Sequence, residues 1–381
     1  MKIAFISYED SKDIKAWSGT ISFMAKYLGK KNEIIRVDNL SRPIDYFFKA
    51  LNYAWVALGK SADYKRNRLF VKIVCKRIQK ELDKLDYDII FAPGSTYITF
   101  LKSDKPIVVW ADATYISMVG FHFQYNKLNN RQIKYGDYLE QVAFDKCSKL
   151  IFSTNRVAES AQNDYKISQE KIEVIPFGAN LIHNHNRESI VELNKLKSTS
   201  KVKLLFIGVY WYNKGGDILL EIFDELRKMD SGYELEVVGS TPKEKKEISG
   251  VNFYGFLDKS IPEQKDKLES LFESSHYFIL PTRSEAYGIS FVEANSYGLP
   301  VFGSNLGGVP DIIEDGINGE LMDIEKSAKF LANQIHNYIS EGDYNKKSLK
   351  AFDHYKENFT WDNSIKRVNN LLEKLVYENK R

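Results

Sequence analysis

Apolar and polar positions along this chain change in an order that predicts strands and helices in turn. A short apolar run at 2–7 leads into a polar stretch, and apolar residues then recur at helical spacing from Ile21 to Leu28. Further apolar runs follow at 87–92, 106–111 and 150–153. The run 106–111 is apolar throughout, as expected of a strand that is buried on both faces. This alternation predicts a parallel, doubly wound α/β sheet.

The pattern stops near Gly178 and then begins again. Residues 179–201 are polar and predict a linker. An amphipathic helix is expected at 216–229, and strands are expected at 203–208, 235–238, 251–254, 277–280 and 299–302. The chain therefore divides into two α/β domains, 1–180 and 181–360, followed by a helix at 361–381 with one apolar face.

Composition agrees with two globular domains of ordinary size in 381 residues, since 43% of the residues are hydrophobic and 28% are charged. The formal net charge of +3 gives no reason to expect a nucleic-acid partner. The start lacks the pattern of a signal peptide, and no run of about 18 apolar residues is present. Cys75 and Cys147 have no CxxC partner, as is usual for reduced thiols. We therefore expect a cytoplasmic protein.

The segment 281–319 carries the most informative chemistry. A predicted strand ends at Leu280, a loop carries Glu285, and Gly288 permits a turn before a helix that begins near Ile289. The start of a helix exposes unpaired N–H groups and a positive dipole end, which suit a phosphate or pyrophosphate. Open α/β sheets bind ligands at the carboxyl ends of their strands, so this loop lies where a ligand is expected.

Two carboxylates flank that helix start. Glu285 and Glu293 are eight positions apart, and both can face a ligand that lies across the first turn. A carboxylate accepts two hydrogen bonds side by side and therefore suits the vicinal hydroxyls of a ribose or hexose. The alternative to ligand binding is that Glu285 is an ordinary charged residue of the loop and Glu293 a solvated residue of the helix.

The same segment resembles the signature of the retaining glycosyltransferases of family four (glycosyltransferase group 1). The matching positions are Glu285, Tyr287, Gly288, Glu293, Ala294, Gly298, Leu299, Pro300, Val301, Gly307, Gly308, Pro310, Asp311, Gly316 and Gly319. The resemblance implies the GT-B fold, with two Rossmann-like domains facing across a cleft. It implies that 1–180 serves the acceptor, that 181–360 binds a nucleotide sugar and that 361–381 crosses back to the N-terminal domain.

The resemblance also implies roles for individual residues. Glu293 is expected to bind the ribose and Glu285 the donor sugar, while Lys214 helps neutralise the departing diphosphate. The family's usual arginine after the strand glycine is replaced by Val209, so Arg283 or the helix start must supply the rest of the charge. The donor-binding residues predicted in this way are Gly19, Gly208, Lys214, Arg283, Glu285, Ala286, Tyr287, Gly288, Ile289, Ser290 and Glu293.

The acceptor side leaves two alternatives open. Asp112 follows the strand 106–111, where the family commonly has a histidine. It binds hydroxyls or acts as a base, or it caps the next helix. Gly19, which follows the first predicted strand, belongs to the donor side and has two interpretations of its own: it brings backbone close to the diphosphate, or it forms an ordinary turn. A structural role is the more common one for a lone histidine such as His122. We predict Glu285, Lys214 and Asp112 as the catalytic residues.

No cofactor and no metal is expected. Asp86 and Asp88 form a D-x-D sequence, but it opens a predicted strand, and His183 and His185 have no acidic or cysteine companions in the linker. The chain contains neither a G-x-G-x-x-G nor a Walker sequence, so dinucleotide and ATP binding have no support.

Residues 60–84 combine nine basic residues with an apolar helix face, and this pattern has two interpretations. The segment docks on anionic lipid, which would make the protein peripheral on the inner face of the membrane, or it is a charged face whose apolar side packs on the sheet.

The function expected from the resemblance is retaining transfer of a hexosyl group from a UDP- or GDP-sugar to a saccharide or lipid-linked saccharide in polysaccharide biosynthesis. The rivals are a sugar-nucleotide epimerase and a non-catalytic donor-binding or membrane-scaffolding partner.

Overall fold

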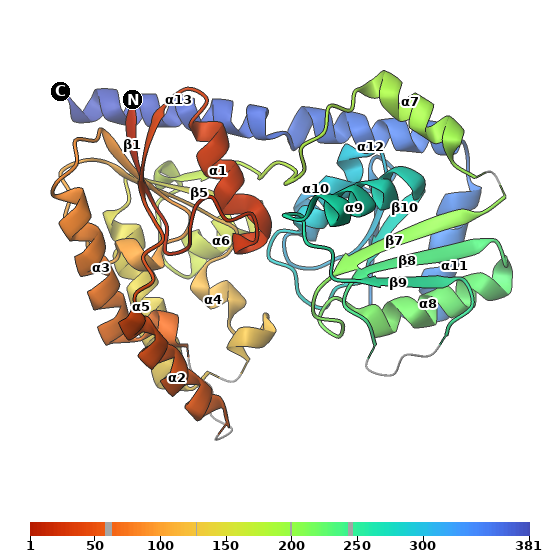
Figure 1. The fold of residues 1–381 in the computed structure, drawn as a ribbon, viewed down its shortest axis with the longest axis horizontal. Coiled ribbons are helices and arrows are strands. Elements are labelled where there is room, and N and C mark those ends of the chain that lie inside the picture. Colours follow the sequence, from red (N-terminus) through yellow and green to blue (C-terminus); the bar gives the residue numbers. More distant parts are fainter. Residues whose placement is uncertain (58–62, 127, 199, 243–246) are drawn as a thin grey trace. The chain divides into compact units, whose positions relative to one another are not determined.

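The computed structural model describes residues 1–57, 63–126, 128–198, 200–242 and 247–381. It separates into two compact units, Met1–Phe177 with Trp361–Arg381 and Gly178–Thr360 (Figure 1). Each unit contains one parallel six-stranded sheet with helices packed on it, which is the doubly wound arrangement that the alternating pattern predicts.

The sheet of unit 1 has the strand order β2-β1-β3-β4-β5-β6. Its central strands are fully buried, and Trp110 in β4 has no exposed surface. Figure 1 shows α13 beside α1, where Trp361 packs against Phe23 with ring centroids 6.1 Å apart. The elements of unit 1 are β1 (Lys2–Ile6), α1 (Thr20–Leu28), β2 (Glu33–Val37), α2 (Pro43–Ala57), α3 (Arg68–Leu82), β3 (Ile89–Ala92), β4 (Ile107–Ala111), α4 (Tyr115–Met118), α5 (Asn130–Lys146), β5 (Lys149–Phe152), α6 (Asn155–Asn163), β6 (Ile172–Val174) and α13 (Trp361–Asn379).

The sheet of unit 2 has the strand order β12-β11-β10-β7-β8-β9. The chain starts this sheet at β7, builds β8 and β9 on one side, and then adds β10 to β12 on the other, so the direction reverses between β7 and β10. The elements of unit 2 are α7 (Arg187–Leu196), β7 (Val202–Gly208), α8 (Gly216–Met229), β8 (Tyr233–Gly239), β9 (Val251–Gly255), α9 (Pro262–Ser274), β10 (Tyr277–Leu280), α10 (Ile289–Ser296), β11 (Val301–Ser304), β12 (Gly319–Met322), α11 (Ala328–Ser340) and α12 (Tyr344–Asn358).

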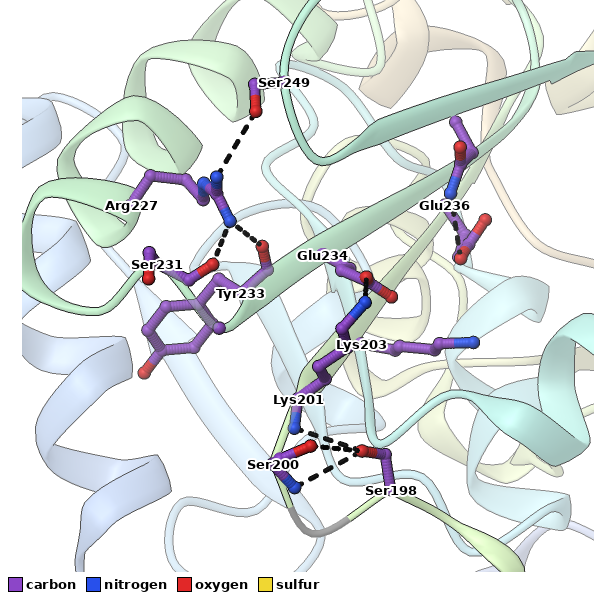
Figure 2. Close-up of polar contacts among 12 residues, drawn as sticks. Ser198, Ser200, Lys201, Lys203, Arg227, Ser231, Tyr233, Glu234, Glu236 and Ser249 are labelled. Carbon is purple, nitrogen blue, oxygen red and sulfur yellow. Dashed lines mark hydrogen bonds and ion pairs between the residues drawn. The ribbon is translucent and has the colours of Figure 1, made fainter.

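The amino-terminal edge of this sheet is fixed by polar contacts among β7, β8 and the end of α8 (Figure 2). Arg227 donates hydrogen bonds to the backbone oxygens of Ser231 and Tyr233, while Lys201 pairs with Glu234 on the neighbouring strand. These contacts lie at the edge where the strands begin, so they stabilise the sheet without occupying the carboxyl edge, where ligands bind in such folds.

The segment that joins the two units contains a helix. The linker predicted at 179–201 is wrong in part, because it contains α7. That helix has a capping box formed by Asn186 and Ser189, and it buries Ile190.

In the basic segment predicted at 60–84, Lys60 lies outside the described residues, and α3 buries Phe70, Val74 and Ile78 in the core of unit 1. The apolar side of α3 therefore packs on the sheet.

Candidate functional site

The candidate site lies at the carboxyl edge of the sheet in unit 2, at the point where the strand order reverses. The turn after β7 carries Lys214 and the loop after β10 carries Glu285. Because β7 and β10 are neighbouring parallel strands, their carboxyl ends meet at one edge. The crevice at such a reversal is the usual ligand site of open α/β sheets.

A lysine and a glutamate from those two strand ends form an ion pair. The Nζ atom of Lys214 lies 2.5 Å from Oε2 of Glu285, and both side chains are largely buried. The backbone N–H of Gly308 donates to the Glu285 carbonyl at 3.2 Å, which ties the glycine pair of the sequence signature to this loop. Lys214 is therefore held at the carboxylate that was predicted to contact the donor sugar.

A second lysine–glutamate pair lies at the same edge and involves a residue that the sequence analysis missed. Lys259, in the loop after β9, places Nζ 2.5 Å from Oε1 of Glu293. Glu293 lies in the second turn of α10 and is only 3% exposed. A buried carboxylate requires a cation or hydrogen bonds, and Lys259 supplies the cation. No local sequence pattern marks Lys259, since its partner is 34 residues away.

Glycines allow the turn after β7 to approach β10 closely. Gly215 has a φ of 72°, and a Cβ atom there would lie 1.8 Å from the carbonyl oxygen of Pro281. A Cβ atom on Gly216 would lie 2.3 Å from the Trp211 ring, and one on Gly208 would lie 2.9 Å from Cβ of Lys214. Gly208, predicted as a donor-binding residue, thus lies against Lys214.

The start of α10 has the predicted geometry for exposed N–H groups. Gly288 is the N-cap residue, with a φ of 103° and no side-chain cap, and Ile289 and Ser290 form the first turn. Ala286 lies in the preceding loop, and Tyr287 is buried. The first N–H groups of an uncapped helix have no intrahelical acceptor, so this end of α10 can donate to an anion.

Arg283 is engaged by protein groups. Its guanidinium donates to both carboxylate oxygens of Asp217, at 2.6 and 2.8 Å, and lies 4.0 Å from the centre of the Tyr212 ring. Burial alone would raise the pKa of Asp217, but the hydrogen bonds and charge of Arg283 outweigh it and lower that pKa. Arg283 as a ligand of the diphosphate stays a prediction.

Asp112, predicted on the acceptor side, and Gly19, predicted as a donor-binding residue, both lie in unit 1. Trp17 Nε1 donates to Oδ2 of Asp112 at 3.1 Å. The N-cap of α4 is Thr114, so the interpretation of Asp112 as the cap of that helix is wrong. Trp17 and Ser18 have φ values of 48° and 55°, and Gly19 continues with 92°. Left-handed backbone in non-glycine residues is strained and is often found at functional loops.

The remaining polar candidates have structural contacts. His122 accepts a hydrogen bond from the backbone of Gln124, and Asp88 accepts one from the backbone of Lys2. His185 does have an acidic neighbour, because its Nε2 lies 3.9 Å from Glu273. Within the described residues, no group of three or more His, Cys, Asp or Glu side chains is arranged to hold a metal ion.

His276, directly before β10, should make the stability of unit 2 depend on pH. Its Nδ1 accepts from Lys203 N–H, and its Nε2 lies 3.0 Å from the Ser198 carbonyl, so the neutral ring fits both partners. Burial lowers the pKa of His276 to about 4. The unfolded chain binds a proton near pH 6.5, whereas the folded chain does not, so stability should fall between about pH 6.5 and 4 by roughly 3 kcal/mol.

The measurement is the urea unfolding free energy from pH 4 to 8. In His276→Gln the unfolding free energy should fall less steeply with decreasing pH below about pH 6.5. The difference in unfolding free energy between the two proteins at pH 8 reports the change in packing alone. An unchanged slope would contradict the assignment. His183, whose pKa burial lowers to about 3, contributes in the same direction in both proteins.

Comparison with known proteins agrees with this fold. The model of the glycosyl transferases group 1 matches residues 189–358, and that of glycosyltransferase family 4 matches residues 48–182. The chain belongs to these glycosyltransferases, and its fold is the GT-B fold.

The individual relatives and solved structures compared below share less than 30% sequence identity with this chain. An uncharacterized glycosyltransferase from Haemophilus influenzae is 28% identical over 57% of this chain and 59% of its own length. The chain spans about half the length of the curated relatives it matches. A sucrose-phosphate synthase from Thermosynechococcus elongatus has a similar fold, with a TM-score of 0.69 at 12% identity over 99% and 100% of the two chains. Anabaena HepE, solved with UDP and glucose, has a TM-score of 0.61 at 17% identity over 98% and 99%.

Proposed function

We propose that the protein is a retaining hexosyltransferase that uses a UDP- or GDP-sugar as donor and a hydroxyl of a saccharide or lipid-linked saccharide as acceptor. The observation that carries the proposal is the pair of lysine–glutamate contacts beside the bare start of α10. Retention and the donor class come from the family resemblance, and the donor class also from HepE, which was solved with UDP and glucose. A protein with this chemistry acts where its acceptor is made, in the cytoplasm or at the inner face of the membrane.

Each ion pair suits an exchange of partners when a donor enters. Without a donor, Lys214 pairs with the negative charge of Glu285. The diphosphate of a nucleotide sugar is also negatively charged and can take the place of Glu285 as the partner of Lys214. When Lys214 turns to the diphosphate, Glu285 becomes able to accept hydrogen bonds from sugar hydroxyls. The same exchange at Lys259 would release Glu293 for the ribose and bring a second cation toward the diphosphate. Lys259 thus offers part of the charge that the family arginine, replaced by Val209, would supply.

The roles in the reaction follow from charge. The bond between the sugar and the diphosphate breaks, and the leaving group gains negative charge, which Lys214 and the N–H groups of α10 stabilise. The acceptor hydroxyl attacks the same face and passes its proton to the leaving diphosphate. The protein contributes positioning and electrostatic stabilisation rather than a covalent intermediate.

Nucleotide binding tests the proposal directly. UDP or GDP at about a hundred times its dissociation constant should stabilise the donor-binding unit by about 2.7 kcal/mol, which raises its melting temperature by roughly 5–10 °C. Lys259→Met should reduce that rise, while Lys195→Met, which removes a lysine from an exposed ion pair on α7, should not. A flat response to every nucleotide would overturn the donor site, and an equal response in both variants would remove Lys259 from it.

Product analysis separates the rival functions. A transferase releases nucleotide only when an acceptor is present, whereas an epimerase returns an altered nucleotide sugar without any acceptor. A protein that binds UDP or GDP but never consumes the sugar would support the non-catalytic alternative that the replaced arginine keeps open.

A further inference from the structure

The helix α2 presents large apolar side chains to solvent. Ile44, Tyr46, Phe47, Leu51, Tyr53 and Trp55 are each between 43% and 66% exposed, and together they form what we call the α2 face. Exposed apolar surface of this extent on one element is uncommon in soluble proteins and marks interaction sites. Lys49 is the one charged residue among the exposed positions of 43–55.

The inner side of α2 explains why the α2 face is turned outward. Phe48 packs on Phe70 of α3 with ring centroids 5.2 Å apart, and Asp45 pairs with Arg77 at 3.0 Å. Asn52 accepts a hydrogen bond from the backbone of Tyr64. Residues 45, 48 and 52 share one side of a helix, so the attachment to α3 fixes the opposite arc outward. Figure 1 shows α2 next to α3 at the periphery of unit 1.

The surface around the α2 face is basic. The segment 42–80 has only two acidic residues, Asp45 and Asp63, and both pair with arginines. Six exposed basic residues on the two helices and beside them have no acidic partner at ion-pair distance among the residues that the structure describes: Arg42, Lys49, Arg68, Lys72, Lys76 and Lys80. Two copies joined through this face would bring like charges together, whereas an anionic surface would neutralise them.

We propose that the α2 face docks in the interface of an anionic lipid bilayer, with the lysines of α3 held at the headgroups. Tyrosine and tryptophan favour the boundary between headgroups and acyl chains, and Tyr46, Tyr53 and Trp55 provide them. Phe47 and Leu51 enter the acyl boundary, and each basic residue near the surface adds electrostatic attraction. Among the helices in the described part of the chain, none is both long and apolar enough to cross a membrane. The inference extends the proposed function by naming the surface that brings the enzyme to a membrane-held acceptor.

Vesicle flotation of the full-length protein tests this inference. The protein should float with vesicles of phosphatidylglycerol and phosphatidylcholine at low salt, and far less at high salt or with phosphatidylcholine alone. The double variant Phe47→Ser, Leu51→Ser should partition on the order of tenfold more weakly. Phe330→Ser, at an equally exposed phenylalanine on α11 in unit 2, is the matched control and should bind as the unaltered protein does.

Fluorescence adds a second measurement that does not depend on how the double variant folds. The emission of Trp55 should shift to the blue on anionic vesicles, and the shift should be lost in Trp55→Phe. The inference would be overturned if the double variant floated as well as the unaltered protein, or if the unaltered protein did not bind the vesicles. It would also be overturned if the unaltered protein were a dimer and the double variant a monomer. Loss of vesicle binding with a normal response to UDP or GDP would leave the proposed function standing, and the reverse result would overturn only that function.

Discussion

Glu285→Gln should lower the rate of sugar transfer by a factor on the order of 10²–10³ while the protein stays folded. Glutamine keeps the size of the side chain but has one acceptor oxygen and no charge. It therefore cannot offer two acceptors to neighbouring sugar hydroxyls, nor hold Lys214 in the ion pair seen at 2.5 Å. Both roles act on the reacting part of the donor, so the loss should appear in kcat as well as in kcat/KM.

The measurement is release of UDP or GDP with saturating donor and acceptor, together with a thermal unfolding curve for each variant. The matched control is Glu192→Gln, because Glu192 also pairs with a lysine, at 2.7 Å, but on the exposed surface of α7. Surface pairs contribute little, so this variant should keep its activity. Full activity in Glu285→Gln would remove Glu285 from the site, and a loss of the fold in that variant would assign the ion pair a structural role.

The sequence predicted the architecture because buried parallel strands leave a strong signal. The strands β1, β3, β4, β7 and β10 are apolar runs bounded by polar turns, and each lies inside a sheet. The strands β2, β6 and β12 were missed, and all three are edge strands with partly exposed residues. An edge strand has a weaker apolar pattern since one side of its ladder faces solvent or a loop. The strand predicted at 299–302 is observed at Val301–Ser304.

The site was predictable where its residues follow one another in the chain and hidden where they do not. Glu285, Gly288 and Glu293 belong to one short segment, so their spacing could be seen directly. Lys259 reaches Glu293 from the loop after another strand, and this contact depends on the order of strands in the sheet. The Asp217 carboxylate that holds Arg283 lies 66 residues away and was hidden for the same reason. Ion pairs between distant segments leave no periodic signal.

The glycine before α8 should be the position in unit 2 where one methyl group has the largest effect. Gly215 combines a φ of 72° with a Cβ position 1.8 Å from the carbonyl oxygen of Pro281, which is backbone and cannot rotate away. Gly215→Ala must therefore move the turn after β7 away from the loop after β10. We expect a loss of about 3–5 kcal/mol in unfolding free energy, because strain and overpacking act together.

Gly342→Ala separates those two causes. Gly342 also has a positive φ, 78°, but a Cβ atom there meets nothing within 4 Å, so this variant reports the conformational cost alone, about 1 kcal/mol. The difference between the two variants in the loss of unfolding free energy, measured by urea unfolding, is the part due to the contact with Pro281. Nucleotide binding should weaken only in Gly215→Ala, because Lys214 and Glu285 lie on the two segments that are forced apart. If both variants lose the same small amount, the turn does not depend on that contact, and the closeness of the two strand ends would not be what aligns the ion pair.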